Sequence, residues 1–468
     1  MTEPQCPNVV FVFPDQMRAQ ATGYAGDPNV HTPALDRLAA ESVNVVTAVS
    51  GHPVCSPYRA SLLTGQYPLT HGVYINDVPL EAPGLYLAEV FAAHGYDTAY
   101  IGKWHLYGSP DGAYGRRRAY IPPEARKGFE YWKAFECNHD YLRSPYFEDD
   151  DPEPKLWEGY DVLAQARDAC TYIREHAGAA RPFLLMLSWG PPHDPYDLVP
   201  EEYLSRYRGR ELVLRPNVPA ACRDQAMEDL RGYYAHITAL DDGVALLLET
   251  LDDVGIAEDT IFVFTSDHGD MHYSQGVRAK HCPWDESIRV PFLLRYPRRT
   301  GRQGRVVDVP LNVPDIMPTL LSLCGLPIPD SVQGRDFSSY LLGERSPDLA
   351  LSAFLSSPVS FGMLRAQGLP SYRGVRTSRY TYVRSMQGPW LLYDNVADPY
   401  QMHNLCDDPA YAEVQNALED ELQAWLARLD DDFLPGQVYL ERDGLTHYRE
   451  VTCEWGRIHT PWTVDAPS

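Results

Sequence analysis

The chain has 468 residues, 44% of them hydrophobic as is ordinary for a soluble globular protein, and this length favours one large domain with a smaller partner. Its 64 acidic and 40 basic residues give a formal charge of -24, which disfavours a role on DNA, RNA or anionic lipid. If the substrate is an anion, the attraction has to come from the site itself.

The first residues of the chain show no export signal. The stretch "MTEPQCPNVVFVFPDQ" lacks a basic n-region, a long apolar h-region and a small-residue cleavage site. No apolar run approaches the roughly 20 residues that a bilayer-spanning helix needs. The nine cysteines are scattered without a CxxC pair, which favours reduced thiols over a disulfide framework or a zinc site. We therefore expect a cytoplasmic protein with no membrane partner.

Four apolar runs along the chain share one pattern, because each is followed within a few residues by polar side chains. They are "NVVFVF" before Asp15 and Gln16, "YDTAYI" before Lys103 and His105, "PFLLMLSW" before His193, and "TIFVFT" before Asp267 and His268. Such runs are typical of parallel strands buried on both faces, and ligands bind beyond the carboxyl ends of these strands. We expect the four polar clusters to converge at one edge of one sheet.

Helical apolar spacing occurs in three further segments. Residues 31–42 carry it, with Thr32 as the N-cap and Pro33 at the first helical position. Residues 70–95 and a longer segment from about Asp224 to Gly255 show the same spacing. We expect all three to be helices that pack on the core.

Two neighbouring segments in the middle of the chain are ambiguous. The stretch "SPYFEDDDPEP", residues 144–154, is rich in acids and proline, which favours a solvated loop over a cation site because no calcium-loop spacing accompanies it. The residues just before it, Asn138, His139 and Tyr141, could border a leaving group. We assign no specificity from either segment.

Beyond residue 345 the pattern changes. The stretch "YRGVRTSRYTYVR" followed by "WLLYDN" predicts antiparallel strands around a Thr-Ser turn, and a helix near residues 410–429 is expected to pack on them. We therefore divide the chain into a large domain over residues 1–345 and a smaller α+β domain over residues 346–468.

The stretch "HPVCSPYRASLLTGQYPLTHG", residues 52–72, places a cysteine just before a helix. Ser56 is a good N-cap and Pro57 a good first helical residue, so a helix is expected over residues 57–64, ending at Gly65. Cys55 then lies at the positive end of a helix dipole, where anions are stabilised and a nucleophile is activated. The alternative is a small buried thiol without a chemical role.

The ends of two apolar runs suit a metal site. Asp15 and Asp267 could hold a hard divalent metal, with Gln16 and His268 as further ligands. Each Asp alone could equally be a loop cap. Two of them, each followed directly by another potential ligand, favour the metal site.

The chain resembles the type I sulfatases of the alkaline phosphatase superfamily. Cys55, Pro57 and Arg59, within "CSPYRASLLTG", match their Cys-x-Pro-x-Arg signature. A second signature follows as "GYDTAYIGKWH" from Gly95 to His105, and the likeness continues through "SDHGD" and "KHCPWDESIRVP" to a tail, "LYDNVADPYQMHNL", similar to the C-terminal domain of these enzymes. The resemblance implies an alkaline-phosphatase-like α/β/α sandwich around a large, mostly parallel sheet, with a smaller C-terminal α+β domain.

The resemblance also implies an arylsulfatase-like activity and residue roles. Cys55 would be oxidised to formylglycine (3-oxoalanine) by a maturation enzyme, and would serve as both nucleophile and metal neighbour. Arg59 and Lys103 would orient the hydrated aldehyde and the sulfate, and His105 would take the proton whose loss expels sulfate. His193 and Lys280 would bind the ester and protonate the leaving alcohol. The substrate would be a small-molecule or sugar sulfate ester, and a homo-oligomer is compatible with the sequence.

Two departures from the family pattern keep alternatives open. Many sulfatases carry Asp-Asp and Asp-Asn where this chain has Asp15-Gln16 and Asp267-His268, which makes Mn2+ or Mg2+ more plausible beside Ca2+. The Gln and His pattern also resembles phosphonate monoester hydrolases, so cleavage of phosphonate monoesters or phosphate diesters is the near alternative. An inactive binding protein and a hydrolase that uses the Cys55 thiol directly are two more.

Overall fold

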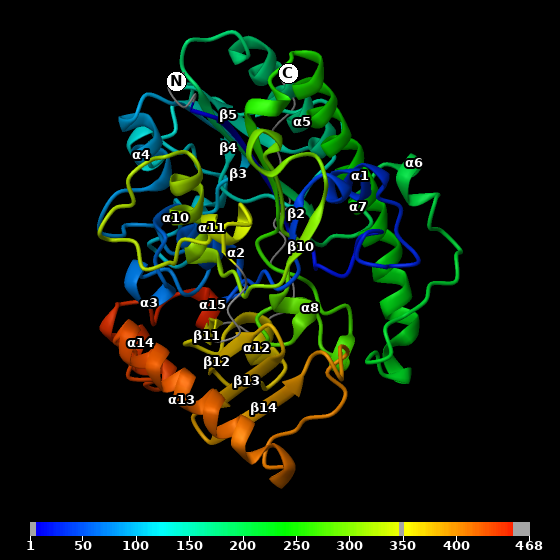
Figure 1. The fold of residues 1–468 in the computed structure, drawn as a ribbon, viewed down its shortest axis with the longest axis vertical. Coiled ribbons are helices and arrows are strands. Elements are labelled where there is room, and N and C mark those ends of the chain that lie inside the picture. Colours follow the sequence, from blue (N-terminus) through cyan, green and yellow to red (C-terminus); the bar gives the residue numbers. More distant parts are fainter. Residues whose placement is uncertain (1–5, 346–350, 453–468) are drawn as a thin grey trace.

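The computed structural model describes residues 6–345 and 351–452 and contains a large sheet flanked by helices and a small sheet beside it (Figure 1). The large sheet has the strand order β10-β2-β9-β8-β1-β7-β3-β4-β5-β6. Its strands are β1 (Asn8–Asp15), β2 (Val43–Val45), β3 (Asp97–Lys103), β4 (Tyr131–Phe135), β5 (Pro145–Glu148), β6 (Lys155–Leu156), β7 (Phe183–Pro192), β8 (Thr260–Phe264), β9 (Leu293–Arg295) and β10 (Arg305–Val307). The strands β8, β1, β7, β3 and β4 pair in parallel, which confirms the mostly parallel sheet.

The helices form layers on both faces of this sheet. The α-helices of the described chain are α1 (Pro33–Ala40), α2 (Cys55–Thr64), α3 (Pro68–His71), α4 (Leu87–Ala93), α5 (Asp161–His176), α6 (Glu201–Leu204), α7 (Arg223–Asp253), α8 (Asp285–Ile288), α9 (Pro297–Thr300), α10 (Val313–Leu323), α11 (Ser338–Leu341), α12 (Gly362–Ala366), α13 (Ala412–Leu429), α14 (Gly436–Arg442) and α15 (Arg449–Thr452). The helices of the C-terminal part, α13 to α15, lie with the small sheet (Figure 1).

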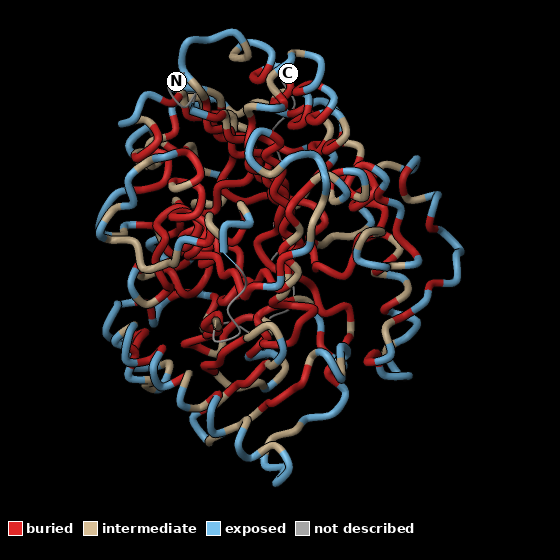
Figure 2. Tube along the Cα trace, in the orientation of Figure 1, coloured by how far each residue is buried: buried red, intermediate tan, exposed pale blue. Residues whose placement is uncertain are grey.

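Alternation along the central strand β1 explains the layers. Val9, Phe11 and Phe13 pack into the core that includes α2, α4 and α10. Val10 and Val12 point the other way and pack into the core that includes α1, α5 and α7. Because successive side chains of a strand point to opposite faces, an uninterrupted apolar run buries both. The result is the expected α/β/α sandwich, with buried chain through its middle and exposed chain at its periphery (Figure 2).

Two of the three expected helices are confirmed. α1 has Thr32 as its N-cap and proline at its first position, and α7 covers most of the long predicted segment. The helix expected over residues 70–95 is wrong, because only α3 and α4 form around it. Pro79 and Pro83 lack the N–H that a helix interior needs, and Leu80 instead donates its N–H to the carbonyl of Leu106 (3.0 Å).

The small sheet follows at the C-terminal side. Its antiparallel strands have the order β11 (Ser352–Ser357), β12 (Tyr372–Thr377), β13 (Tyr380–Ser385) and β14 (Gly388–Asp394). The predicted hairpin is confirmed, with Ser378 and Arg379 at its turn, and α13 packs on the sheet as expected. The predicted boundary between residues 345 and 346 adjoins residues 346–350, which lie outside the described residues.

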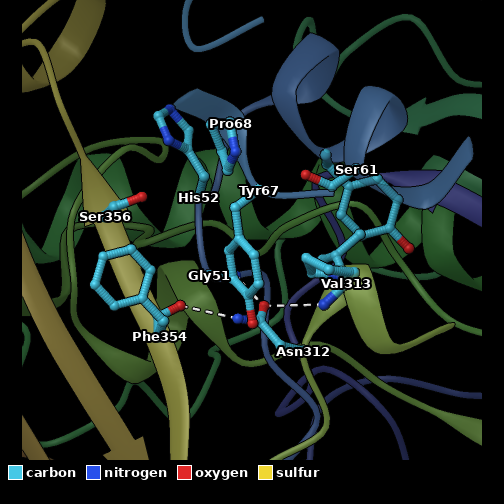
Figure 3. A pocket seen from close by; sticks show the side chains of 11 residues that line it. Gly51, His52, Ser61, Tyr67, Pro68, Asn312, Val313, Phe354 and Ser356 are labelled. Carbon is cyan, nitrogen blue, oxygen red and sulfur yellow. Dashed lines mark hydrogen bonds between the residues drawn. The ribbon is translucent and has the colours of Figure 1, made fainter. Parts of the chain in front are cut away.

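Buried polar contacts join the two sheets. Figure 3 shows Asn312, just before α10, whose side-chain N–H donates to the carbonyl of Phe354 on β11 (2.8 Å). The N–H of Gly51 donates to the side-chain oxygen of Asn312 (2.9 Å). A Cβ on Gly51 would lie only 2.4 Å from the Phe354 carbonyl oxygen, so glycine is required for this close approach.

Two buried arginines of β12 are paired at this junction, Arg376 across it and Arg373 within the part of the chain that carries the small sheet. Arg373 forms an ion pair with Asp431, and Arg376 pairs with Asp285 of α8 (3.2 Å). The hydroxyl of Tyr439 also donates to Asp431 (2.7 Å). These charges are therefore fully paired where they are removed from water.

Three other expectations concern the chain as a whole. Within residues 6–345 and 351–452, no helix combines the length and the apolarity needed to span a bilayer. The eight cysteines that the structure describes are all free thiols. Residues 144–154 are a solvated loop only in part: residues 145–148 form β5 with Pro145 and Phe147 buried, so the prediction is wrong there, whereas the turn that follows, with Asp150 exposed, is solvated as predicted.

Candidate active site

The carboxyl ends of four neighbouring strands carry the polar clusters. β8, β1, β7 and β3 are neighbours and run in parallel, so their ends meet at one edge of the sheet. Asp15 ends β1 and Lys103 ends β3, whereas His193 follows β7 and Asp267 follows β8. All four side chains are buried. The structure thus brings together residues that are up to about 250 positions apart.

Cys55 enters this edge from α2. It is the first residue of the helix, whose N-cap is Val54, so the prediction that Ser56 caps the helix is wrong. Ser56 lies in the first turn instead, where its N–H donates to the side-chain oxygen of Asn76 (3.1 Å). Gly65 ends the helix as predicted, with a left-handed φ of 65°. Every residue of α2 is buried, so the Cys55 thiol lies at the positive helix end inside the protein.

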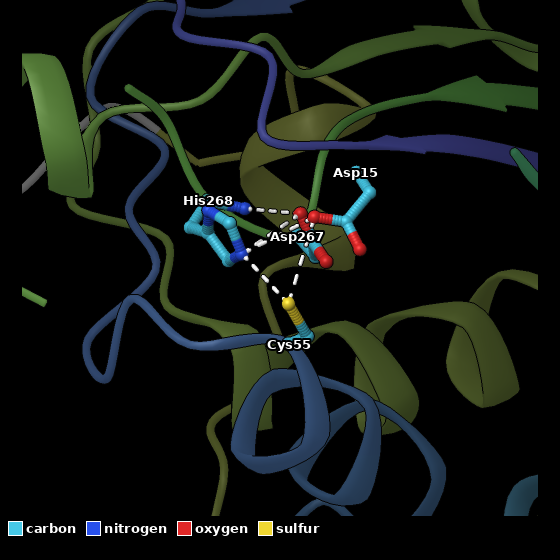
Figure 4. Close-up of side chains that lie close together, drawn as sticks. All are labelled: Asp15, Cys55, Asp267 and His268. Carbon is cyan, nitrogen blue, oxygen red and sulfur yellow. Dashed lines mark hydrogen bonds and ion pairs between the residues drawn. The ribbon is translucent and has the colours of Figure 1, made fainter. Parts of the chain in front are cut away.

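Asp15, Cys55, Asp267 and His268 form a compact cluster of potential metal ligands (Figure 4). Their ligand atoms all lie within 4.8 Å of one another. The Sγ atom of Cys55 is 3.6 Å from Oδ1 of Asp15 and 3.3 Å from Nε2 of His268. Two buried carboxylates, a thiol and an imidazole at such distances are a donor set for a divalent cation.

Gln16 adjoins the cluster and has a fixed orientation. Its backbone lies in the left-handed region (φ 73°), and its N–H donates to Oδ1 of Asp267 (2.8 Å). The side-chain amide N–H donates to Asp270 (2.6 Å). The amide oxygen is buried and has no hydrogen-bond partner in the described part of the chain. Because a buried acceptor left without a partner is costly, this oxygen fits a ligand to a cation.

Three cations surround the cluster. Nζ of Lys103 lies 2.6 Å from Oδ2 of Asp15, and Nζ of Lys280 lies 3.0 Å from Sγ of Cys55. Arg59 donates through Nη1 to Ser188 (2.6 Å) and through the same atom to the carbonyl of Lys103 (2.7 Å). Its Nη2 lies 3.5 Å from both Asp15 and Asp267. In an acidic protein, this is a local positive site for an anion.

Burial and these cations shift the acid strengths of the cluster. Although burial raises it, Lys103 and Lys280 hold the pKa of Asp15 well below its usual value. Burial and Asp15 raise the pKa of Asp267 to about 6. For Cys55, burial and Asp15 raise the pKa, but Lys280, Lys103 and the nearby His105 outweigh them and leave it at about 7. The site therefore stabilises negative charge at position 55.

Two histidines lie near the cluster, His105 close to Cys55 and His193 close to Asp15. His105 is buried and has a left-handed backbone (φ 57°), and its Nε2 lies 3.6 Å from Oδ1 of Asp77. Nδ1 of His193 lies 2.7 Å from the carbonyl oxygen of Asp194. The ring of His193 stacks on that of His139, with centroids 4.6 Å apart, and the hydroxyl of Tyr141 donates to the His193 carbonyl (2.9 Å). Of the three residues suspected to border a leaving group, His139 and Tyr141 thus contact His193.

Sequence reasoning missed several residues that hold the site together. Ser188 binds Arg59, Asp77 lies beside His105, and Asp270 binds Gln16. Ser188 is the one polar residue within the apolar run "FLLMLSW", which was a usable signal for a special position. Asp77 gave no such signal, because its partner is brought near only by the fold.

The fold and the site define a class. The structure is a three-layer α/β/α sandwich with a buried cysteine at a helix start, a cluster of potential metal ligands and several basic side chains at the carboxyl edge of its sheet. This combination is typical of the alkaline phosphatase superfamily of hydrolases.

Comparisons with known proteins give the family. The family model described as "Sulfatase" matches residues 7–326, and the model "N-sulphoglucosamine sulphohydrolase, C-terminal" matches residues 275–428. An "Ulvan-active sulfatase" of Formosa agariphila is 46% identical over 444 residues, which are 94% of this chain and 85% of that protein. The chain belongs to the sulfatase family, and it is a sulfuric ester hydrolase.

Solved structures agree with the fold. A Bacteroides thetaiotaomicron chain labelled 4S-sulf, from work on the metabolism of multiple glycosaminoglycans, has a TM-score of 0.82 and 32% identity, and the match covers 94% of this chain and 100% of that one. A phosphonate monoester hydrolase of Agrobacterium radiobacter has a TM-score of 0.72 and 24% identity, covering 90% and 96%. The second likeness shows the fold alone.

Proposed function

We propose that the protein hydrolyses the sulfate monoester of a saccharide, with residue 55 as a formylglycine nucleophile and one divalent cation. The observation that carries the proposal is the buried set of Asp15, Cys55, Asp267 and His268 ringed by basic side chains. A sulfate monoester is a stable anion, so its hydrolysis needs charge neutralisation, an aligned nucleophile and an acid for the leaving oxygen. This edge of the sheet offers residues for each task.

The family implies a formylglycine at the position of Cys55, and its hydrated aldehyde supplies the attacking oxygen. Arg59 and Lys103 are fixed by Ser188 and Asp15, so they would orient that hydrate and the sulfuryl oxygens without moving. Because the whole of α2 is buried, a maturation enzyme could not reach Cys55 in the folded chain. We therefore propose that oxidation precedes folding.

The cation would be held by Asp15, Asp267, His268, residue 55 and the amide oxygen of Gln16. When bound, it would neutralise charge on the sulfuryl oxygens and lower the barrier to attack. The two buried carboxylates and the free Gln16 oxygen fit such an ion. The amide of Gln16 stands where many relatives have a carboxylate, and the imidazole of His268 stands where they have an amide. This donor set suits Mn2+ or Mg2+ as well as Ca2+.

Two groups of residues would move protons. His105 lies beside position 55 and would take the proton whose loss releases sulfate. His193 lies near Asp15 and Lys280 near residue 55, and they would bind the ester and protonate the leaving alcohol. Lys280 is within 3.0 Å of the Cys55 sulfur, so it is placed to contact an oxygen bound there.

A saccharide is the favoured leaving group. The relative named for its activity on ulvan and the structure from work on glycosaminoglycans both point to sulfated sugars.

The second candidate is a phosphonate monoester or phosphate diester hydrolase with the same machinery. The Asp15-Gln16 and Asp267-His268 pairs favour it, because they resemble those of phosphonate hydrolases. Lys103 and His105, the residues that sulfatases use around the aldehyde, favour the sulfatase.

Parallel turnover of an aryl sulfate and an aryl phosphonate monoester, on matured protein, tests the proposal. We expect the sulfate to be hydrolysed faster, and a panel of sulfated sugars to be desulfated. Turnover that favours the phosphonate by orders of magnitude would contradict the sulfatase assignment. Ligand binding that is unchanged in Cys55→Ala, without turnover of either ester, would identify an inactive binding protein.

A further inference from the structure

We propose that Asp77 is a positioning residue for His105, holding the imidazole as a proton acceptor beside position 55. This inference rests on the proposed function, in which His105 takes a proton next to that position. Asp77 lies after α3, outside the strands and the helix that carry the other site residues.

Asp77 and His105 face each other in the protein interior. Oδ1 of Asp77 lies 3.6 Å from Nε2 of His105, and the two side chains are 1% and 3% exposed. Both ring nitrogens of His105 are buried and form no hydrogen bond with any residue that the structure describes. The gap exceeds a hydrogen bond by a few tenths of an ångström, and such catalytic contacts are often long without substrate and tighten when it binds.

Arg117 fixes the Asp77 carboxylate. Its Nε donates to Oδ1 (2.8 Å) and its Nη2 donates to Oδ2 (2.6 Å). Arg117 in turn lies over the ring of Tyr114 (4.5 Å) and 3.7 Å from Glu450 of α15. A bidentate pair of this kind fixes orientation as well as charge. The C-terminal helix α15 thereby adds a support to the carboxylate that faces His105.

Other charged groups near His105 have other tasks. The Glu136 carboxylate accepts the backbone N–H groups of Tyr107 (3.1 Å) and Gly108 (2.8 Å). The N–H of His105 donates to the Glu136 carbonyl (2.8 Å), so Glu136 fixes the backbone of this turn. Lys103 is bound to Asp15, and the thiol of Cys137 also lies near the imidazole; although burial raises its pKa, His105 and Lys103 lower it to about 7. Asp77 remains as the carboxylate that faces the imidazole ring.

The chemical need for such a partner follows from the ring. An imidazole that accepts a proton at one nitrogen must carry hydrogen on the other, and a carboxylate beside that nitrogen selects the tautomer and stabilises the cation that forms. Asp77 would hold the Nε2–H tautomer and leave Nδ1 as the acceptor. The proton would pass from the hydroxyl at position 55 to Nδ1, and return to solvent before the next turnover.

Asp77→Asn tests the proposal with little structural change. Asp77 has a left-handed backbone (φ 65°), a conformation that asparagine tolerates well. In matured protein we expect kcat to fall about 100-fold or more with KM within about twofold. The first turnover of alcohol should stay fast while release of inorganic sulfate becomes slow. NMR of 15N-labelled histidine should show loss of the Nε2–H tautomer of His105.

Asp443→Asn is the matched control. The Asp443 carboxylate accepts a hydrogen bond from the hydroxyl of Tyr74 (2.8 Å). Tyr74 lies on the same segment as Asp77, but no contact joins Asp443 to His105 among the described residues. We expect its kcat and its His105 tautomer to equal those of the parent. An Asp77→Asn enzyme that keeps both kcat and the tautomer overturns the proposal, as do equal losses in both variants. If the parent fails to hydrolyse sulfate esters, the proposed function fails, and the tautomer alone decides the role of Asp77.

Discussion

The catalytic edge of the large sheet and the junction with the small sheet both bury several charges, but they treat them differently. At the junction, the Arg373 side chain donates to Asp431, and Tyr439 satisfies the same carboxylate. At the edge, the amide oxygen of Gln16 has no hydrogen-bond partner among the described residues, and Oδ2 of Asp267 and Nη2 of Arg59 approach each other only to 3.5 Å, without a hydrogen bond. Paired charges specify a structure, whereas buried polar atoms left free indicate a site for a ligand.

Replacing Cys55 should give the largest effect and sharpen this difference. Cys55→Ala removes the nucleophile, so we expect activity to fall by about 10⁴-fold or more while the free energy of unfolding changes little. Turnover and thermal unfolding of matured protein measure both. Cys170→Ala, which changes a buried thiol of α5 away from the site, is the control and should keep its activity. Equal activity of Cys55→Ala and parent would exclude residue 55 as nucleophile.

Removing the Arg373 side chain should have the opposite effect to Cys55→Ala, lowering stability while leaving activity unchanged. Arg373→Ala leaves the Asp431 carboxylate buried without its cation, so we expect a loss of about 3–5 kcal/mol in the free energy of unfolding. The activity of the molecules that remain folded should be unchanged. Denaturant titration and specific activity below the unfolding transition check this pair of outcomes. The double variant Arg373→Met with Asp431→Leu should recover much of the loss, and failure to do so would argue against the charge explanation.

Asp270 should affect the cation and not the fold. Its carboxylate accepts the amide N–H of Gln16 and the hydroxyl of Tyr196 (2.5 Å), so Asp270→Asn would disturb the orientation of the Gln16 oxygen. We expect divalent-cation affinity to fall about 10- to 100-fold, measured by titration calorimetry with Mn2+ and Ca2+. Unchanged affinity would remove Gln16 from the ligand set.

Acid should weaken the Arg373–Asp431 ion pair over a defined pH range. Although burial raises it, Arg373 holds the pKa of Asp431 below its ordinary value, so the folded state binds this proton less readily than the unfolded state. The Asp431 carboxylate therefore contributes its full stabilisation to the free energy of unfolding above the unfolded pKa of about 3.9. This stabilisation is lost as the pH falls through the lower pKa of the folded state. Unfolding followed from pH 5 to pH 2 should show a smaller loss in Asp431→Asn than in the parent. If the free energies of unfolding of Asp431→Asn and the parent fall equally with pH, Asp431 is not the cause of the loss in acid.

Local patterns predicted the elements that are fixed by local rules. The apolar runs predicted β1, β3, β7 and β8, and the proline and threonine at the start of α1 predicted its beginning. The helix over residues 70–95 failed because its apolar spacing ignored two prolines. The N-cap prediction at Ser56 failed because the helix already begins at Cys55, and Asn76, 20 positions away, accepts the N–H of Ser56.

The site was predictable only in part for the same reason. Asp15, Gln16, Asp267 and His268 follow strands, so topology alone places them together. Ser188 lies 129 positions from Arg59, and Asp77 and Arg117 form their pair across 40 positions, from a turn and from a short 3-10 helix. Contacts of this kind depend on the tertiary structure, and neither the periodicity nor the composition of the chain predicts them.

We propose that Cys55 is oxidised to an aldehyde. Peptide mass spectrometry across "HPVCSPYRASLL" measures directly which residue is present at position 55. The protein should be expressed with a formylglycine-generating enzyme, beside a sulfatase known to be converted. We predict an aldehyde or its hydrate at position 55, and no conversion when the folded, unmodified protein is treated afterwards, since α2 is buried. An unmodified thiol at position 55, in a preparation where the control sulfatase is converted, would contradict the account.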